Sequence, residues 1–361
     1  MRPYLPCVML AGALLSGCAQ DAPQSRATPS TAVVSPTTAA PSPGPAGGLD
    51  TSSPEVIATG LEAPWGLDFL PNGDALVTER DTARVLRVPA AGGDPVEVTR
   101  VAAAEPSGEG GLLGLAVTPN GATVYVYVTT ADDNRILRFP LASPKDVEPV
   151  LTGIPKGQIH NGGRLTINDG LLWAGTGDTG DTTLSQDPHS LGGKVLRMTL
   201  DGEPVRGTGS LVFSRGHRNV QGIAFGPDGQ PYSVEFGQNR FDEVNAIEQG
   251  SNGGWPDVEG PGDGGGRFLA PITTWETAEA SPSGAAVVGD VLYVAALRGQ
   301  RLWQVPLADP GRPTALFEGV YGRLRTAERA PDGSLWVMTS NRDGRGAPSA
   351  DDDRILRLAP R

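Results

Sequence analysis

A six-fold repeat constrains the fold of this chain more than any other feature of its sequence. Each unit contains an apolar alternating run, a glycine-containing turn and a second alternating run. Alternation with a period of two indicates β-strands with one buried face, so each unit is predicted to be an antiparallel hairpin. The units are GLDFLPNGDALVTE (66–79), GLAVTPNGATVYVYV (114–128), GRLTINDGLLWAGT (163–176), GIAFGPDGQPYSVE (222–235), AAVVGDVLYVAA (285–296) and RTAERAPDGSLWVMT (325–339).

The turns and the segments that follow the hairpins extend this pattern. Asn-Gly and Asp-Gly supply the positive φ angles of two-residue hairpin turns, and these are the turns we expect. A third strand-like piece follows every hairpin, for example ARVLRVP (83–89) and NRILRFP (134–140). The sequence therefore predicts an all-β fold, a six-bladed β-propeller with four-stranded antiparallel blades. The turn glycines are Gly73, Gly121, Gly170, Gly229 and Gly333, together with a reversed Gly289-Asp290.

A propeller closes only if both chain ends meet in one blade. The strand-like segment 54–60 precedes the first repeat, so we expect it to pair with the last blade beside residues 354–359. An immunoglobulin-like sandwich is the alternative, and six equivalent hairpins favour the propeller. The longest insertions are expected after blades three and four, at 178–191 and 250–272, and long loops usually gather on the functional face.

The first 53 residues have a different composition. Residues 1–18 contain one basic residue, an apolar run too short to span a bilayer, and Leu15-Ser16-Gly17-Cys18, which is typical of a secretion signal. The last four residues resemble the lipobox of bacterial lipoproteins, in which Cys18 carries the lipid; a cleaved signal with a coincidental cysteine is the alternative. Residues 19–53, rich in Ala, Pro, Ser and Thr, predict a disordered tether. We expect the folded domain, 54–361, to be held outside the cytoplasm on the outer face of the cell membrane, or in the periplasm.

Charge and cysteine content exclude two classes of function. The formal net charge of −12 argues against a nucleic-acid partner, because phosphate binding needs a basic surface. The two cysteines, Cys7 and Cys18, both precede the folded domain, so that domain has neither a disulfide nor a thiolate metal site.

Polar residues stand just before the first strand in most repeats. The first strand of each blade lines the central channel, so these residues are predicted to converge at one mouth. Arginine guanidinium groups pair with carboxylates and carbonyls, and the densest stretch, SRGHRNVQG (214–222), therefore suits a planar anionic ligand. The converging positions are Glu109, His160, His217 to Asn219, Ser281 to Ser283, Arg323 and Arg325, with Pro64-Trp65 in the first blade.

Histidines and acidic residues add two candidate sites. His160 stands at the predicted mouth before Asn-Gly-Gly and is a candidate general base, with a histidine bonded to a neighbouring blade as the alternative. For His189 and His217 we favour that structural role. Asp242, Glu243 and Asp263 lie among glycines, and oxygen ligands in a flexible loop suit Ca²⁺, with a solvated acidic loop as the alternative.

Together these motifs resemble the soluble quinoprotein glucose/sorbosone dehydrogenase family, which includes bacterial aldose sugar dehydrogenases. The resemblance covers the folded domain and implies a six-bladed propeller that binds pyrroloquinoline quinone (PQQ) and Ca²⁺ above the channel. It further implies oxidation of the anomeric carbon of aldose sugars to lactones, with electrons passed to an acceptor that the sequence does not identify. The resembling segments are 63–80, 108–119, 159–165, 193–202, 216–225, 235–247 and 252–260.

The resemblance implies a role for individual residues. His160 matches the family's catalytic base, and Arg218 matches a cofactor-binding residue near the reacting carbonyl. Glu109 stands where some members place a sugar-binding Gln, which puts sugar specificity in doubt. The other implied cofactor contacts are Asn219, Arg298 (a Lys in the family), Arg323, Arg325 and, more loosely, Thr277. The implied calcium ligands are the carbonyls of Gly237 and Gln238 (usually Pro) at the cofactor, and Glu243, Gly253 (usually Tyr) and Asp263 at a structural site.

Two other functions fit the predicted fold. A calcium-dependent lactonase-type hydrolase would need its metal held by side-chain carboxylates on the axis, and a non-catalytic propeller would bind a partner without chemistry. Four arginines predicted at one mouth favour the quinoprotein instead. The loops between blades are short, which favours a broad range of aldoses.

Overall fold

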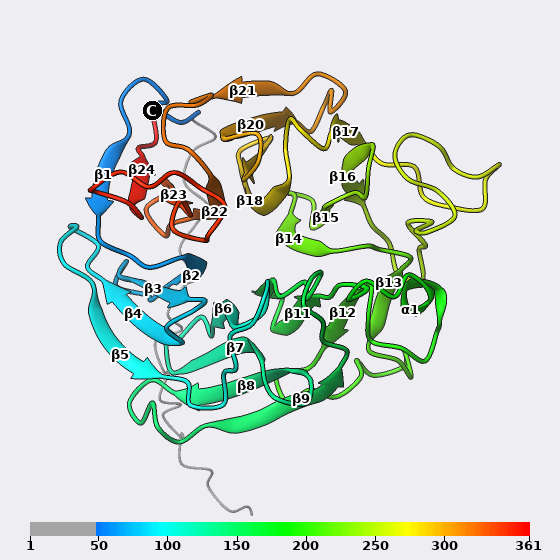
Figure 1. Ribbon diagram of the computed structural model, residues 1–361, viewed down its shortest axis with the longest axis horizontal. Helices are drawn as coiled ribbons and strands as arrows, with labels where there is room; N and C mark the ends of the chain where they lie inside the picture. The colour runs from blue at the N-terminus through cyan, green and yellow to red at the C-terminus, as the bar shows by residue number, and fades with distance from the viewer. Residues whose placement is uncertain (1–47) are drawn as a thin grey trace, which may run out of the picture. The chain divides into compact units, whose positions relative to one another are not determined.

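The computed structural model describes residues 48–361, and in this part of the chain six four-stranded antiparallel sheets surround a common axis (Figure 1). This arrangement confirms the predicted six-bladed β-propeller. Blade 1 contains β2 (Pro64–Phe69), β3 (Ala75–Glu79), β4 (Arg84–Val88) and β5 (Val96–Arg100); blade 2 contains β6 (Leu112–Val117), β7 (Thr123–Thr129), β8 (Asn134–Pro140) and β9 (Glu148–Ile154); blade 3 contains β10 (Leu165–Asn168), β11 (Leu171–Gly175), β12 (Lys194–Met198) and β13 (Val212–Arg215).

The remaining blades repeat this order from the axis outward. Blade 4 contains β14 (Val220–Phe225), β15 (Pro231–Glu235), β16 (Phe241–Ala246) and β17 (Thr273–Glu276); blade 5 contains β18 (Pro282–Val288), β19 (Val291–Ala296), β20 (Arg301–Pro306) and β21 (Thr314–Leu316); blade 6 contains β22 (Leu324–Arg329), β23 (Leu335–Thr339), β24 (Ile355–Leu358) and β1 (Glu55–Ala58). The one helix of the described residues, α1 (Thr183–Gln186), is a single turn, and no helix in residues 48–361 is long and apolar enough to cross a membrane.

The ring closes as predicted, because β1 supplies the outer strand of blade 6. Glu55 pairs with Arg357 in an antiparallel register. The contact extends further toward the N-terminus than expected: Leu49 bridges Pro360, and the Asp50 amide donates to the Ala359 carbonyl at 2.8 Å. Leu49 is buried in the core, so the folded domain begins by Gly48 and not at Pro54. The predicted signal, the lipobox and most of the tether lie outside the described residues.

Four of the six hairpins turn through a longer loop than the two-residue turn we expected. In the Pro-Asn-Gly and Pro-Asp-Gly loops, the glycine amide donates to the carbonyl three residues earlier, for example Gly73 to Leu70 at 2.9 Å and Gly333 to Ala330 at 2.9 Å. Proline at the second position and glycine at the fourth are the pattern of a type I turn. Only Asp169-Gly170 and Gly289-Asp290 are two-residue turns.

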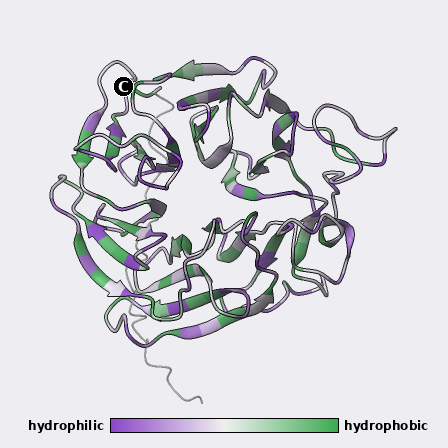
Figure 2. Cartoon of the chain, viewed as in Figure 1, coloured by the Kyte–Doolittle hydropathy of each residue, from purple (hydrophilic) through white to green (hydrophobic). Residues whose placement is uncertain are grey.

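The hydrophobic core consists of layers between neighbouring sheets. One layer packs Leu67 and Val77 of blade 1 against Trp336 and Met338 of blade 6, and the Phe69 and Trp336 rings meet edge to face at 5.1 Å. The outer strands alternate between hydrophobic and hydrophilic residues (Figure 2), as expected for strands with one buried face.

The inner strands approach one another so closely that several positions admit only glycine. A Cβ built on Gly66 would lie 2.7 Å from the Leu115 amide nitrogen, and one on Gly114 would collide with the Gly163 carbonyl and lie 2.8 Å from the Leu165 nitrogen. The recurrent glycine at the start of the repeats therefore allows blade-to-blade contact around the axis.

Most inner strands also begin with a bulge. In five of the six first hairpins the register shifts near the start of the inner strand, which leaves one or two residues without a cross-strand partner. Such bulges turn a side chain out of the regular alternation. The residues without a partner include Trp65, Leu113, Gln221, Ser283 and Arg325.

The long insertions lie within blades and not after them. Residues 178–191 connect β11 to β12, and 250–272 connect β16 to β17. The second insertion starts at the end of the propeller opposite the predicted mouth. It then runs parallel to β13, with Asn252 bridging Arg215, and so reaches the mouth from the side.

Gly114→Ala tests the crowding of the inner strands. We expect the free energy of unfolding to fall by about 1–3 kcal/mol, since the added methyl group overpacks a rigid contact. Urea denaturation measures the change. Gly311→Ala is the control, because a Cβ there meets nothing within 4 Å. Equal stability of the two variants would contradict this account of the repeated glycine.

Candidate active site

His160 lies at the channel mouth with all three of its polar groups engaged. Its φ of 53° is unusual for a non-glycine residue and turns the ring toward the axis. Its amide donates to Glu109 Oε2 at 3.0 Å, Nδ1 lies 2.6 Å from Asp178 Oδ1, and Nε2 lies 2.8 Å from Arg218 Nη2. The side chain is 10% exposed.

These contacts determine the tautomer of His160. Arginine has donors and no acceptor, so Nε2 must accept the bond from Arg218 and carries no proton. The proton of the neutral ring then lies on Nδ1 and is donated to Asp178. Nε2 therefore has the lone pair that a general base requires, and in this structure that lone pair accepts the bond from Arg218.

Asp178 is held as an ionised carboxylate. Burial would raise its pKa, but hydrogen bonds from His160 and Gly180, and a bond of 2.9 Å from the Trp255 indole to Oδ2, outweigh burial and lower the pKa. An ionised carboxylate on Nδ1 orients the imidazole and stabilises its protonated form.

Arg218 is fixed by neighbours from blade 4. Its Nε donates to Gln238 Oε1 at 2.8 Å and its Nη1 to the Phe236 carbonyl at 3.2 Å, while its amide donates to Glu235 Oε2 at 2.7 Å. Burial lowers its pKa, and the carboxylates of Asp178, Glu109 and Glu235 oppose that shift, so the guanidinium stays charged.

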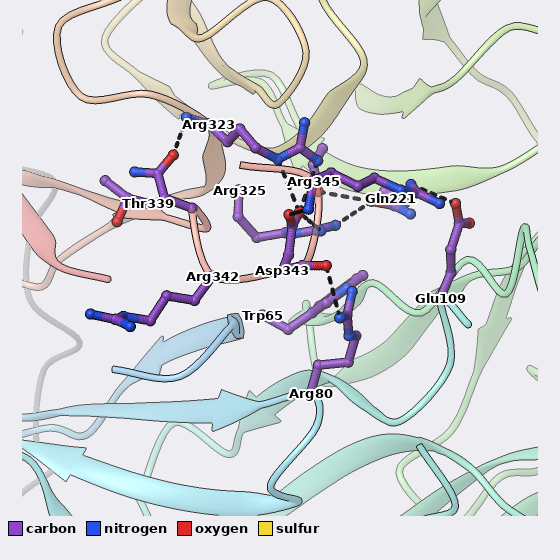
Figure 3. Close-up of polar contacts among 12 residues, drawn as sticks. Trp65, Arg80, Glu109, Gln221, Arg323, Arg325, Thr339, Arg342, Asp343 and Arg345 are labelled. Atoms are coloured by element: carbon purple, nitrogen blue, oxygen red, sulfur yellow. Dashed lines mark hydrogen bonds and ion pairs between the residues drawn. The ribbon is translucent and has the colours of Figure 1, made fainter. Parts of the chain in front are cut away.

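Arg323 and Arg325 converge on one carboxylate, Asp343, from the loop between β23 and β24 (Figure 3). Arg323 donates to Asp343 Oδ2 through Nε at 3.0 Å and Nη2 at 2.8 Å, and Arg325 Nη2 lies 3.4 Å from the same oxygen. Arg325 also donates to Gln221 Oε1 at 3.0 Å. Burial lowers the pKa of Arg325 to about 9, and Asp343 opposes this shift, so the arginine is charged at neutral pH.

A small cavity lies beside Arg325 and Gln221. Its volume of about 20 Å³ has room for roughly one water molecule. Above it, Arg345 Nη1 and Glu109 Oε1 form an ion pair of 2.8 Å, which joins blade 6 to blade 2 across the mouth (Figure 3). Arg345 is 59% exposed in its side chain, so this pair is weak enough to exchange partners. The lining residues are Trp65, Arg80, Glu109, Gln221, Phe236, Leu297, Arg325 and Arg345.

Two buried donors at the mouth have no acceptor among residues 48–361. They are Arg325 Nε and Asn219 Nδ2. A buried donor without a partner is costly, and both atoms belong to residues predicted to bind a cofactor rich in acceptor oxygens. The donor set therefore fits an anionic ligand with several carboxylates or carbonyls, such as PQQ.

The predicted cofactor-calcium ligands lie beside Arg218. Gly237 and Gln238 form the turn between β15 and β16, next to the Phe236 carbonyl that Arg218 binds. Neither of their carbonyls accepts a hydrogen bond within the described chain. Free carbonyls are suitable Ca²⁺ ligands, so these residues fit the ion.

The acidic segment differs from its predicted form. Asp242 and Glu243 lie in strand β16 and not in a flexible loop, so their side chains point to opposite faces and cannot share one ion. Asp242 accepts the amides of Gly237 at 2.9 Å and Ser281 at 2.6 Å. No three His, Cys, Asp or Glu side chains of the described residues gather as a metal site.

The structural calcium site stays a prediction. Glu243 accepts the Gly260 amide at 2.6 Å, and burial raises the pKa of this carboxyl to about 8. Gly253 donates to the Arg215 carbonyl at 2.9 Å, and Asp263 accepts the Gly265 amide at 2.9 Å. Each of these three residues thus has a hydrogen bond with a different part of the chain.

Four predicted residues remain: two histidines and two proposed cofactor contacts. His217 is fully buried between Ser214 and Glu235, at 2.6 and 2.7 Å, which confirms its structural role. His189 is exposed and not bonded to a neighbouring blade through its ring, so that prediction is wrong. Arg298 is exposed after β19, and Thr277 is half-buried after β17, where its amide bonds the Arg240 carbonyl.

Sequence reasoning missed several residues of the site. Asp178, Trp255, Asp343 and Arg345 lie in insertions rather than ahead of an inner strand, so the rule that found His160 did not apply to them. Gln221 lies within the 214–222 motif, but no feature of the sequence singles it out. Gly177 precedes Asp178 and Gly344 follows Asp343 in the sequence, and an adjacent glycine is a weak signal of a special backbone position.

The fold and site together define a six-bladed propeller protein with a histidine and several arginines gathered at one mouth of its channel. A family model for glucose/sorbosone dehydrogenases matches residues 61–356. The chain therefore belongs to the glucose/sorbosone dehydrogenase family.

Individual relatives agree with this assignment. The chain is 32% identical over 261 residues to quinoprotein glucose dehydrogenase B of Acinetobacter calcoaceticus, a match to 60% of this chain and 55%, about half, of that relative. It is 25% identical over 359 residues to an aldose sugar dehydrogenase of Escherichia coli, 86% of this chain and 94% of that one. The solved PQQ-bound aldose sugar dehydrogenase of Streptomyces coelicolor matches with 49% identity and a TM-score of 0.80, over 86% of this chain and 99% of that one.

Asp343→Asn tests the counter-charge for the arginine pair. We expect the free energy of unfolding at neutral pH to fall by about 3 kcal/mol, because removal of one partner leaves buried charge uncompensated. Arg325 and Arg323 outweigh burial and lower the pKa of Asp343, so its stabilisation is complete above the ordinary Asp pKa of about 4 and is lost as the pH falls through the lower folded-state pKa.

Urea denaturation from neutral to acidic pH measures both effects, and the difference between wild type and variant should shrink in acid. Asp351→Asn is the control, since Asp351 is an exposed carboxylate on the same loop. A difference that stays constant across the pH range would contradict this role of Asp343.

Proposed function

We propose that this protein is a PQQ-dependent aldose dehydrogenase that oxidises the anomeric carbon of aldose sugars to the lactone, with His160 as general base. The observation that carries the proposal is the pair of contacts of His160, Nδ1 to Asp178 and Nε2 to Arg218, at a mouth where Arg325 and Asn219 have donors without acceptors. The 49% identity to a PQQ-bound aldose sugar dehydrogenase over nearly its whole length supports it.

The residues present would hold the cofactor and its ion in complementary ways. Arg323, Arg325 and Asn219 offer donors to carboxylate and quinone oxygens. Exposed Arg298 and half-buried Thr277, which follow β19 and β17, would contact the cofactor from the side. The carbonyls of Gly237 and Gln238 would ligate Ca²⁺. When bound, PQQ with Ca²⁺ supplies the two-electron acceptor for the hydride of the sugar C1.

The protein's own groups then handle the proton. His160 Nε2 accepts the proton of the anomeric hydroxyl, so the sugar loses a hydride and a proton and becomes the lactone. Asp178 keeps the Nδ1 proton in place and stabilises the imidazolium. As substrate enters, Arg218 Nη2 would release Nε2, while the bonds of Arg218 to Gln238 and Phe236 keep its positive charge at the site, where it would stabilise the negative charge that develops on the quinone oxygen. Glu109, which holds the His160 amide, lies where it can contact sugar hydroxyls.

Access to this site requires a rearrangement. A cavity of about 20 Å³ is smaller than PQQ, so we propose that the Arg345–Glu109 ion pair, whose residues line it, opens when the cofactor binds. The pair is exposed on the Arg345 side, and its opening has a small cost.

We further propose that lipidated Cys18 anchors the protein outside the cytoplasm, supported by the Leu15-Ser16-Gly17-Cys18 sequence. Membrane fractionation tests this, since Cys18→Ser should appear in the soluble fraction.

A titration of the apoprotein tests the function. Addition of PQQ and Ca²⁺ should change the PQQ absorbance saturably and create dye-reducing activity with hexoses, pentoses or disaccharides. Chelation of Ca²⁺ should abolish both. PQQ binding without activity on any aldose would contradict the substrate class. Absence of PQQ binding would favour a non-catalytic propeller, and lactone hydrolysis without PQQ would favour the hydrolase.

His160→Ala and Asp178→Asn test the base. We expect kcat to fall by about 10²- to 10⁴-fold in His160→Ala, the usual contribution of positioned proton transfer. Asp178→Asn should also lower kcat, because an amide no longer enforces the tautomer. PQQ binding, followed by absorbance, should change little in either variant. Normal turnover in His160→Ala would refute the base assignment and leave the cofactor site intact.

A further inference from the structure

Glu259 binds an unusual set of donors for a single carboxylate. Its Oε1 accepts the amides of four consecutive residues, Gln238 at 2.7 Å, Asn239 at 2.8 Å, Arg240 at 3.0 Å and Phe241 at 3.3 Å. The first three belong to the turn between β15 and β16 and Phe241 begins β16, whereas Glu259 belongs to the insertion between β16 and β17. A distant segment of the chain thus holds the backbone of the Gly237–Gln238 turn.

This contact sets the direction of two carbonyl groups. In a trans peptide the N–H and C=O point in opposite directions. The Gln238 amide shares its peptide with the Gly237 carbonyl, and the Asn239 amide with the Gln238 carbonyl. Since both amides point at Glu259, both carbonyls point away from it on the same side. Neither carbonyl accepts a hydrogen bond in the described part of the chain.

The Phe236–Gly237 peptide also has its N–H and its C=O pointing in opposite directions, each toward a different partner. The Gly237 amide donates to Asp242 Oδ1 at 2.9 Å, and the Phe236 carbonyl of that peptide accepts Arg218 Nη1 at 3.2 Å. Gly237 itself leaves no room for a side chain, because a Cβ would collide with the Phe241 carbonyl and lie 2.9 Å from Glu259 Oε1. The backbone of this turn is therefore fixed by two carboxylates.

Glu259 also carries the charge needed for this role. Four backbone N–H donors converge on its Oε1, which is the environment that a carboxylate anion accepts. A carboxylate that accepts a peptide N–H polarises the peptide and makes its carbonyl oxygen more negative. Hard cations such as Ca²⁺ bind more tightly to such oxygens.

We propose that Glu259 is a positioning residue that presents the carbonyl oxygens of Gly237 and Gln238 as a preformed, polarised pair for Ca²⁺. The inference rests on the proposed function for the identity of the ion. It adds a residue that does not touch the ion, acts through the peptide backbone, and comes from a different connection of blade 4.

The test compares Glu259→Ala and Glu259→Gln with Asp257→Ala. Asp257 is an exposed carboxylate on the same segment, so its removal changes the local charge and leaves the four amides bonded. At fixed PQQ, Ca²⁺ is titrated and the PQQ absorbance gives the half-saturating concentration. Calorimetric titration of Ca²⁺ without PQQ, and the melting temperature of each apoprotein, are measured in parallel.

We expect the half-saturating Ca²⁺ concentration to rise at least about tenfold in Glu259→Ala, since charge-assisted hydrogen bonds are the strong ones and all four are lost. Glu259→Gln should be intermediate, because its oxygen still accepts but lacks the charge. Asp257→Ala should match wild type, and excess Ca²⁺ should restore the wild-type spectrum of Glu259→Ala.

A Ca²⁺ midpoint within about twofold of wild type in both Glu259 variants, with only the apoprotein melting temperature lowered, would show a structural role and overturn the proposal. Wild-type protein that binds Ca²⁺ but no PQQ would contradict the proposed function alone, and the calorimetric comparison would still decide the role of Glu259. Wild-type protein that binds neither would overturn both.

Discussion

Crowding of the inner strands around the axis is the constraint on which the rest of this structure depends. Where neighbouring blades meet, there is no space for a Cβ on Gly66 or Gly114. Glycines and β-bulges at the start of the inner strands relieve this crowding. A bulge redirects the side chain that it leaves without a cross-strand partner. Trp65, Gln221 and Arg325 are three such residues, and all three line the cavity at the mouth. Tight packing of the propeller and the position of its functional groups thus have a common origin.

Charge balance at the mouth explains how an acidic protein keeps several arginines buried. Arg323 and Arg325 share Asp343, and Arg218 lies among the carboxylates of Asp178, Glu109 and Glu235. The balance is incomplete in one respect, since Arg325 Nε and Asn219 Nδ2 have no acceptor in the described residues. These groups make the mouth selective for a ligand that brings negative charge and acceptor oxygens. Arg218 of the same network donates to His160 Nε2, so the arginine donors and the proposed base belong to one arrangement.

Two long connections between strands supply the side chains that orient the residues at the mouth. The 250–272 insertion follows β13 to the mouth and delivers Trp255 to Asp178 and Glu259 to the Gly237–Gln238 turn. The loop after β23 delivers Asp343 to the arginines and Arg345 to Glu109. Each of these contacts joins residues far apart in the chain. They orient groups that the inner strands bring close but do not align.

The sequence by itself determined the number of blades, the strand that closes the ring, and the convergence of Glu109, His160, Arg218 and Arg325, because periodic hydrophobicity and glycine turns are local properties of the chain. It did not determine that Asp242 and Glu243 lie in a strand, nor that four hairpins use a type I turn in a longer loop. Only the tertiary structure decided the tautomer of His160, the pairing of Asp343 with two arginines, and the direction of the Gly237 and Gln238 carbonyls. Hydrogen bonds between separate connections of the chain set these features. His160 and Arg218 meet across neighbouring blades, whereas Asp343 and Glu259 reach their partners within blades 6 and 4.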